Sequence, residues 1–81
     1  MKLIRISSMW CTSCIVTKKD WDEIKIKYDY EEYDYDMDEE IISKYNVGNI
    51  LPVIIVLDND TEINRIIGEK SKKEIEKILG D

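Results

Sequence analysis

Residues 53–57 form a run of five apolar side chains, Val-Ile-Ile-Val-Leu, with no polar position among them. A strand that alternates in polarity can leave one face in water, whereas a strand that is apolar throughout must be covered on both faces. The run is followed by the turn-forming residues 58–60, Asp-Asn-Asp, and by a mixed segment over residues 62–67. The pattern predicts a β-hairpin whose first strand lies inside a covered sheet.

The N-terminal third of the chain predicts a strand followed by a helix. Residues 2–7 are rich in β-branched side chains and end at a pair of serines, as a short strand does. From Cys11 onward the apolar spacing changes to three or four residues, which places the side chains on one face of a helix. We expect a single helix over about residues 11–28, with a buried stripe of Cys14, Thr17, Trp21, Ile24 and Tyr28.

The middle of the chain predicts a second strand and a short helix. Tyr33 and Tyr35 alternate with acids in residues 31–36, which favours a half-buried strand. Asp38 stands before two glutamates and an apolar pair, a pattern that suits the start of a helix. We expect that helix to end near residues 46–48.

The end of the chain predicts one more helix and completes the fold. Ser71 and Glu74 form a capping box in front of an apolar helical pattern. The predicted fold is therefore α/β, with the element order β-α-β-α-β-β-α in a single domain over residues 1–81. We expect a four-stranded mixed sheet flanked by helices, its first two strands parallel and its last two antiparallel.

The charge balance and the lack of histidine exclude several classes of function. The 81 residues include 12 Lys and Arg against 18 Asp and Glu, and the formal charge of -6 repels nucleic-acid phosphates and anionic membrane surfaces. The chain contains no His, so mechanisms that need an imidazole base or an imidazole metal ligand are excluded. We expect neither a nucleic-acid partner nor a membrane partner.

The two cysteines, Cys11 and Cys14, are three positions apart and cannot brace distant segments of the chain. The apolar run in residues 1–6 is too short for a signal peptide, so we expect a cytoplasmic protein, and a monomer. In that compartment a close cysteine pair is more often catalytic, redox-sensing or metal-binding than structural.

The cysteines lie where a turn runs into the first predicted helix, in the segment Trp10-Cys11-Thr12-Ser13-Cys14. At the helix N-terminus the sulfur of Cys11 faces unpaired amides and the positive end of the helix dipole, which stabilise a thiolate. Cys14 lies almost one turn further on, within reach of a disulfide. We expect Cys11 to be exposed and to attack a substrate disulfide, and a shielded Cys14 to resolve the mixed disulfide.

Several residues together resemble the thioredoxin family over nearly the whole chain. The resemblance implies a minimal thioredoxin fold that lacks the extra N-terminal strand and helix of full-length members. The residues that carry it are the Trp-Cys-x-x-Cys motif from Trp10 to Cys14, the single proline Pro52 at the start of the third strand, the Asn59-Asp60 turn, and Ile67-Gly68 before the last helix.

The resemblance implies an enzyme, a thiol–disulfide oxidoreductase that reduces disulfide-containing protein substrates. A recycling reductase or another dithiol donor would restore its dithiol, and no cofactor or metal is expected. The bond before Pro52 is implied to be cis, with the Leu51-Pro52 segment facing the cysteines and its backbone open to an extended substrate peptide. The implied apolar collar consists of Trp10, Ile15, Ile50, Leu51 and Ile67, although simple packing is the alternative for Trp10 and Ile50.

The chain also departs from the family pattern around the cysteines. Thr12-Ser13 replaces the usual Gly-Pro, and these hydroxyls are candidates to donate to the Cys11 sulfur and tune the reduction potential. Lys19 stands where the family has a proline that kinks the first helix, so we expect a straighter helix.

A second departure concerns two charges beneath the site. Arg5 stands where the family has a buried Asp, and Glu32 stands where it has a Lys on the adjacent strand. We hypothesise that Arg5 and Glu32 form a cross-strand ion pair, in which Arg5 favours thiolates and Glu32 accepts the proton of Cys14. The alternative is that both are solvated strand charges.

Other functions fit the sequence less well. A glutaredoxin-like, glutathione-dependent reductase would need a Gly-rich, acidic motif that residues 68–71 lack. A metal-binding module could use Cys11 and Cys14 as half of a Zn²⁺ site, with further ligands from a second chain. A redox-inert binding module would not need the intact cysteine pair. A Ca²⁺ loop is suggested by the alternation of Asp34, Asp36 and Asp38, but Glu39 and Tyr45 break its pattern.

Overall fold

Strand β3 (Val53–Asp58) lies inside a four-stranded sheet of order β2-β1-β3-β4, in a computed structural model that describes residues 1–80. The other strands are β1 (Lys2–Ser7), β2 (Asp29–Asp34) and β4 (Thr61–Ile67). Strands β1 and β2 are parallel, whereas β3 is antiparallel to both β1 and β4. The predicted mixed sheet, with its parallel and antiparallel pairs, is confirmed.

The hairpin between β3 and β4 closes through a two-residue turn. Asn59 and Asp60 both have positive φ values, 52° and 64°, as the twist of a tight hairpin requires. Val56 pairs with Asn64 and Leu57 with Glu62, so Ile63 is an extra residue that bulges from β4. The acidic turn that ended the apolar run in the sequence therefore connects two paired strands.

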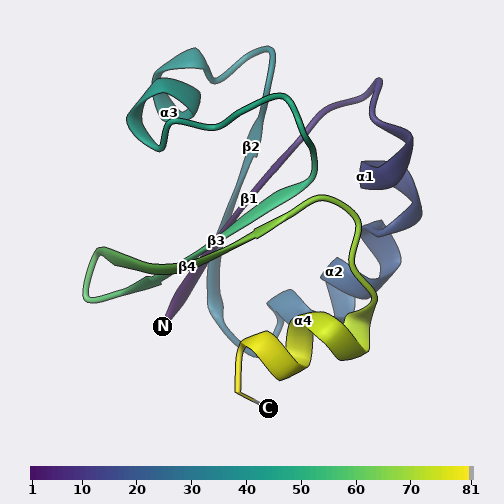
Figure 1. Ribbon diagram of the computed structural model, residues 1–81, viewed down its shortest axis with the longest axis vertical. Coiled ribbons are helices and arrows are strands. Elements are labelled where there is room, and N and C mark those ends of the chain that lie inside the picture. Colours follow the sequence, from purple (N-terminus) through teal and green to yellow (C-terminus); the bar gives the residue numbers. More distant parts are fainter. Residues whose placement is uncertain (81) are drawn as a thin grey trace.

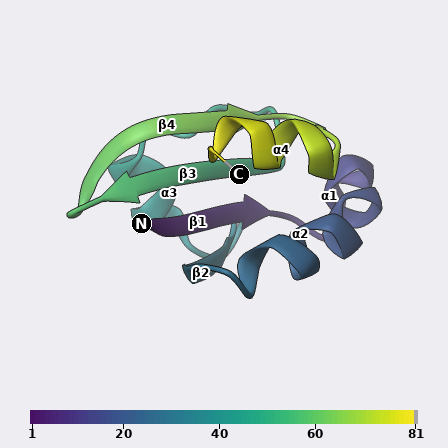
Figure 2. The ribbon, with the colours of Figure 1, turned by 90° about the horizontal axis from the view of Figure 1, so that it is seen from below.

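The helices cover the sheet on both sides. Helices α1 (Thr12–Val16), α2 (Lys18–Lys25) and α4 (Lys72–Ile78) lie on one side of the sheet, and α3 (Glu39–Lys44) lies on the other (Figures 1 and 2). The predicted capping box is present at α4, where the Ser71 hydroxyl accepts a hydrogen bond from the Glu74 amide at 3.2 Å. None of the helices in residues 1–80 is long and apolar enough to span a membrane.

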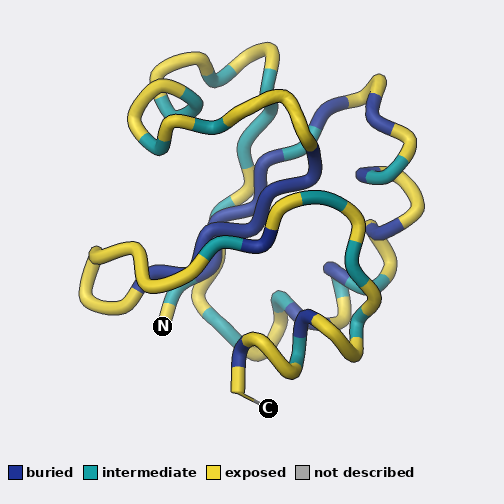
Figure 3. The backbone as a smooth tube through the Cα atoms, in the orientation of Figure 1, coloured by how far each residue is buried: buried dark blue, intermediate teal, exposed yellow. Residues whose placement is uncertain are grey.

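Strand β3 supplies side chains to two separate cores. Ile54 and Val56 point toward α2 and α4 and join one cluster, while Val53, Ile55 and Leu57 join a second cluster on the α3 side. The most buried backbone accordingly follows β1 and β3 through the centre of the molecule (Figure 3). This is the two-sided cover that the unbroken apolar run predicted.

The first helix differs from the prediction because it is interrupted at Thr17. Four members of the expected stripe, Cys14, Thr17, Trp21 and Ile24, are buried. The fifth, Tyr28, is only half-buried and lies beyond the end of α2, so that part of the prediction is wrong. The helix nevertheless divides into α1 and α2, and the Thr17 hydroxyl donates to the Ser13 carbonyl at 2.6 Å. The expectation of a single helix is therefore wrong, whereas the expectation of a straighter helix, drawn from Lys19, stays a prediction.

Strand β2 begins two residues earlier than predicted, at Asp29, and the acids after it shape a turn. The Asp34 carboxylate accepts hydrogen bonds from the amides of Asp36 and Met37, and the Asp38 carboxylate accepts one from the Asp34 amide at 2.8 Å. These acids thus hold the connection from β2 to α3. Tyr35 continues the pairing with β1, because its amide donates to the Ser7 carbonyl.

We predict that Ile55→Ala lowers the free energy of unfolding by about 3 kcal/mol, because Ile55 is fully buried and its loss leaves a cavity. Urea titration followed by far-UV circular dichroism measures the change. Ile63→Ala is the matched control, since Ile63 is 55% exposed and should change stability by less than about 0.5 kcal/mol. Equal effects of the two substitutions would contradict the assignment of the core.

Candidate active site

Cys11 occupies the N-cap position of helix α1, directly after the loop that leaves β1. Its backbone is extended, with φ -90° and ψ 109°, and its sulfur accepts a hydrogen bond from the Cys14 amide at 3.2 Å. A helix begins with amides that have no partner in the helix, and an N-cap side chain satisfies one of them. A sulfur in this position is thus held by the helix and receives an N–H aimed at its lone pairs.

Both cysteines are free thiols, and both are buried. Cys11 is 8% exposed and Cys14 is 3% exposed. The sequence correctly ranks Cys14 as the more shielded, but the expectation of an exposed Cys11 is wrong. Cys11 is less accessible than expected because it packs in the same apolar cluster as Ile6, Leu51 and Val53.

The Leu51-Pro52 segment lies next to the cysteines because β3 pairs antiparallel with β1. This pairing sets Val53, at the start of β3, beside Ile6, near the end of β1. The peptide bond between Leu51 and Pro52 is cis. The Pro52 carbonyl accepts a hydrogen bond from the Gly68 amide at 2.9 Å, which ties this segment to the connection after β4.

Exposed apolar side chains surround the two thiols. Trp10, Ile15, Ile50 and Ile67 are between 49% and 66% exposed. Leu51, which was predicted to join them, is only 6% exposed and belongs to the core cluster, so its side chain is not part of the collar. Residues on three separate segments thus present apolar surface around a pair of buried sulfurs.

Trp10 has partners that the sequence did not reveal. Its indole N–H donates to the Asp36 carboxylate at 2.7 Å, and its ring meets the Tyr35 ring edge to face at 6.1 Å. These contacts join the cysteine loop to the connection between β2 and α3, 26 residues away. The acids of residues 34–38 gave no local signal for this contact, because their spacing is explained equally well by a turn.

The side chains between the cysteines play no part in holding the Cys11 sulfur. The sulfur accepts from the Cys14 amide, in place of the Thr12 or Ser13 hydroxyl that was considered. Thr12 is exposed, and the carbonyl of Ser13 accepts the hydroxyl of Thr17. The backbone of the helix therefore satisfies the sulfur, which corrects the expectation of a hydroxyl donor.

Arg5 and Glu32 lie opposite each other in the register of β1 and β2, as the hypothesis required. The direct ion pair, however, is wrong. The Arg5 guanidinium donates to the Cys14 carbonyl at 2.9 Å, whereas Glu32 accepts the indole N–H of Trp21 at 2.6 Å and faces the Lys25 ammonium at 3.7 Å. Arg5 thus bonds to a residue of α1, and Glu32 contacts two residues of α2.

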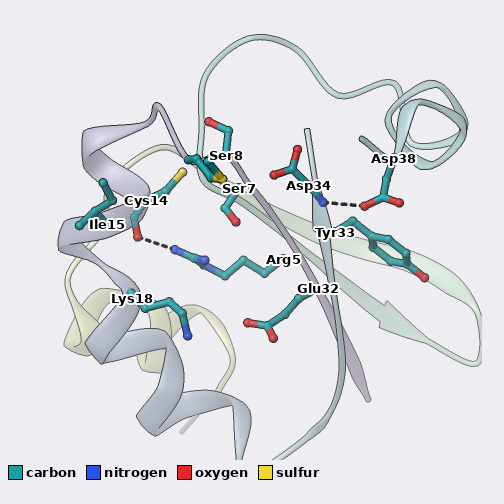
Figure 4. Close-up of a pocket in the computed structure, with 11 residues that line it drawn as sticks. Arg5, Ser7, Ser8, Cys14, Ile15, Lys18, Glu32, Tyr33, Asp34 and Asp38 are labelled. Atoms are coloured by element: carbon teal, nitrogen blue, oxygen red, sulfur yellow. Dashed lines mark hydrogen bonds between the residues drawn. The ribbon is translucent and has the colours of Figure 1, made fainter. Parts of the chain in front are cut away.

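Arg5 is also buried, with 3% of its surface exposed, so it is not a solvated strand charge. Figure 4 shows its side chain running under the active-site helix toward Cys14, with Glu32 beside it. Both residues border an open hollow of about 640 Å³ between α1 and β2, which Cys14, Lys18 and Tyr33 also line. Cys14 thus borders this hollow, although only 3% of its surface is exposed.

The surroundings of Cys14 disfavour its ionisation. Burial raises the pKa of Cys14 to about 11, and the hydrogen bond with Cys11 acts in the same direction. The Ser8 backbone and the positive charge of Arg5 act in the opposite direction. In the reduced protein at neutral pH, Cys14 is therefore a protonated thiol.

Comparison with known proteins agrees with this geometry. The thioredoxin family model matches residues 1–81. A reduced thioredoxin pre-protein of Schistosoma mansoni is 25% identical and superposes with a TM-score of 0.84 over 96% of this chain and 74% of that one. Thioredoxin 1 of Thermosipho africanus is 22% identical, with a TM-score of 0.85 over 98% of this chain and 90% of that one.

A third structure, Trxlp of Edwardsiella tarda, is 18% identical and has a TM-score of 0.88 over 99% of this chain and 82% of that one. A search of curated protein sequences found no significant match. In residues 1–80, no three His, Cys, Asp or Glu side chains cluster as metal ligands do. The fold, the cysteine pair and the match over residues 1–81 together show that this chain belongs to the thioredoxin family, which supports thiol–disulfide oxidoreductase activity.

Proposed function

We propose that the protein reduces disulfide bonds in protein substrates, with Cys11 as the nucleophile and Cys14 as the resolving cysteine. The observation that carries this proposal is the hydrogen bond from the Cys14 amide to the Cys11 sulfur, at 3.2 Å. An amide aimed at the sulfur stabilises negative charge on it, and a thiolate is the form that attacks a disulfide. The buried position of both sulfurs means that a substrate must dock before it can react.

The apolar collar is the docking surface in this proposal. An extended substrate peptide would lie against Trp10, Ile50 and Ile67 and pair its backbone with that of Leu51, ahead of β3. Apolar surface of this kind accepts many sequences, because burial of apolar area does not depend on direction. The substrate class is therefore disulfide-bonded segments of proteins in extended conformation.

The reaction divides into two exchanges. The Cys11 thiolate attacks one substrate sulfur, a mixed disulfide forms, and the other substrate sulfur leaves as a thiolate. Cys14 then gives up its proton and attacks the sulfur of Cys11, which releases the second substrate thiolate and leaves a disulfide between Cys11 and Cys14. The substrate has gained two electrons, and a recycling reductase or dithiol donor must return them to this protein.

The proton of Cys14 needs an acceptor, because burial keeps this thiol protonated. Glu32 borders the same hollow as Cys14, and we propose that it takes the proton through solvent in that hollow. We further propose that the protein acts as a monomer in the cytoplasm, where a close cysteine pair is kept available as a dithiol.

We predict that Cys11→Ser abolishes reduction of insulin disulfides, because no other group in the chain can start the exchange. Insulin turbidity in the presence of dithiothreitol measures the activity. Cys14→Ser is the matched variant, and it should accumulate a mixed disulfide with the substrate that is visible by mass spectrometry under non-reducing conditions. Full activity of the Cys11→Ser variant would overturn the assigned roles.

We also predict that the second exchange accelerates with pH. Since the pKa of Cys14 is raised to about 11, its thiolate fraction should rise about tenfold for each pH unit between roughly pH 7 and pH 9. Stopped-flow measurement of substrate release from the preformed mixed disulfide follows this step alone. A rate that stays constant over this range would mean that Glu32 removes the proton within the exchange step, or that Cys14 is already ionised. Glu32→Gln separates the two, because it makes the rate depend on pH only in the first case.

A further inference from the structure

Arg5 carries a buried charge whose role is not explained by the fold alone. It lies on β1 beneath the active-site helix and is 3% exposed. A buried guanidinium without a carboxylate partner costs free energy, and an apolar side chain of similar size would avoid this cost. The position therefore suggests that something at the site gains from the charge.

The guanidinium has two hydrogen-bond contacts, both at the point where the first helix is interrupted. Its Nη2 donates to the Cys14 carbonyl at 2.9 Å and approaches the Thr17 hydroxyl at 3.4 Å. In an unbroken helix the Cys14 carbonyl would accept the amide of Lys18. Insertion of a side chain into this ladder is a known cause of a break, so Arg5 accounts for the interruption at Thr17 that the sequence pattern did not predict.

The carboxylates near Arg5 are occupied by other groups. Glu32 is held by Trp21 and Lys25, and Asp22 is held by Lys18 at 2.7 Å and by Lys25 at 3.1 Å. In residues 1–80, no carboxylate lies within 4 Å of the Arg5 guanidinium. The guanidinium lies over the Trp21 ring, 5.9 Å from its centroid. Its charge interacts most strongly with Cys14 and then with Glu32, Asp22 and Cys11, and a guanidinium keeps this charge at any pH the protein meets.

We propose that Arg5 is a positioning residue that holds the Cys14 carbonyl at the break between α1 and α2, and that its positive charge stabilises the reduced form of the Cys11–Cys14 couple. This inference rests on the proposed dithiol chemistry. Oxidation joins the two sulfurs in one bond, passes two electrons to the substrate disulfide and leaves no thiolate behind. Glu32 and Asp22 act on Arg5 in both forms, whereas a cysteine thiolate is present only in the reduced form. The charge of Arg5 therefore favours the reduced form, and the disulfide form becomes a stronger oxidant.

The effect of Arg5 should grow with pH, because the fraction of reduced protein that carries a thiolate grows with pH. Charged side chains face this region from β2, from α2, from the start of α3 and from the segment before α4. They are Glu32, Asp34, Lys18, Asp22, Lys25, Asp38 and Lys70. A merely structural role for Arg5 would change stability, but it would not produce a shift of the redox equilibrium that depends on pH.

The test is the redox equilibrium of the purified protein with glutathione at pH 7 and pH 8.5. In Arg5→Met the equilibrium should move toward the disulfide by about tenfold at pH 8.5, which is about 30 mV in reduction potential, and by less at pH 7. Arg5→Lys keeps the charge but loses the forked donor, so it should stay within about threefold of the wild type while losing stability. Lys19→Met removes an exposed charge on α2 and should leave the equilibrium unchanged.

Glu32→Gln is a second variant, expected to shift the redox equilibrium in the opposite direction. It remains informative if Arg5→Met fails to fold. Without the negative charge of this carboxylate, the positive charge of Arg5 stabilises a cysteine thiolate more strongly, so the equilibrium should move toward the dithiol. Equal shifts in Arg5→Met and Arg5→Lys, no shift in Arg5→Met, or a shift toward the disulfide in Glu32→Gln would each overturn the inference. If the wild type never forms a Cys11–Cys14 disulfide, the proposed function itself fails, and that outcome is seen before any variant is compared.

Discussion

The antiparallel pairing of β1 with β3 is the constraint on which both the core and the site depend. Strand β3 is apolar on both faces, so it is stable only in the interior of the sheet. There β4 pairs with one of its edges and β1 with the other. In this pairing the end of β1 meets the start of β3, with Ile6 beside Val53. The loop that carries the cysteines and the Leu51-Pro52 segment are consequently neighbours, although some forty residues separate them in the chain.

The active site also depends on how the chain leaves β1. The short loop after Ser7 ends at Cys11, which caps a helix with its sulfur instead of an oxygen. A helix must satisfy its first amides, so the backbone itself supplies the donor that faces the Cys11 sulfur. Trp10 fixes the outside of this loop through Asp36, while Arg5 fixes the helix from beneath through the Cys14 carbonyl. The segment that carries the two sulfurs is therefore held from both sides by contacts that reach across the fold.

The sequence predicted the order of the elements and two of the three strand pairings, β1 with β2 and β3 with β4, but it did not predict the pairing of β1 with β3. The apolar run of β3, the helical stripe through Trp21 and the capping box at Ser71 are all local signals, and each is confirmed. The break at Thr17 was not predicted, because the arginine that we propose holds it lies 12 residues away on another element. The contact between Trp10 and Asp36 was missed for the same reason.

The sequence predicted which residues lie at the site and how two of them are in register, but it did not predict their hydrogen-bond and ion-pair partners. Arg5 and Glu32 do face each other across β1 and β2, since strand register follows from the pattern of burial. Their ion pair does not form because Trp21, Lys25 and the Cys14 carbonyl compete for the same groups at shorter range. Competition of this kind is decided by packing in three dimensions, which periodicity does not describe.

Strand β2 forms one border of the sheet, with a row of backbone groups that no further strand covers. Such a border is a template on which other chains can add and aggregate, and charged side chains are a common protection against it. Four of the six residues of β2, in the sequence Asp-Tyr-Glu-Glu-Tyr-Asp, are acidic. A second copy paired along this strand would bring like charges together. This repulsion disfavours the addition of further copies at the edge and the growth of fibres.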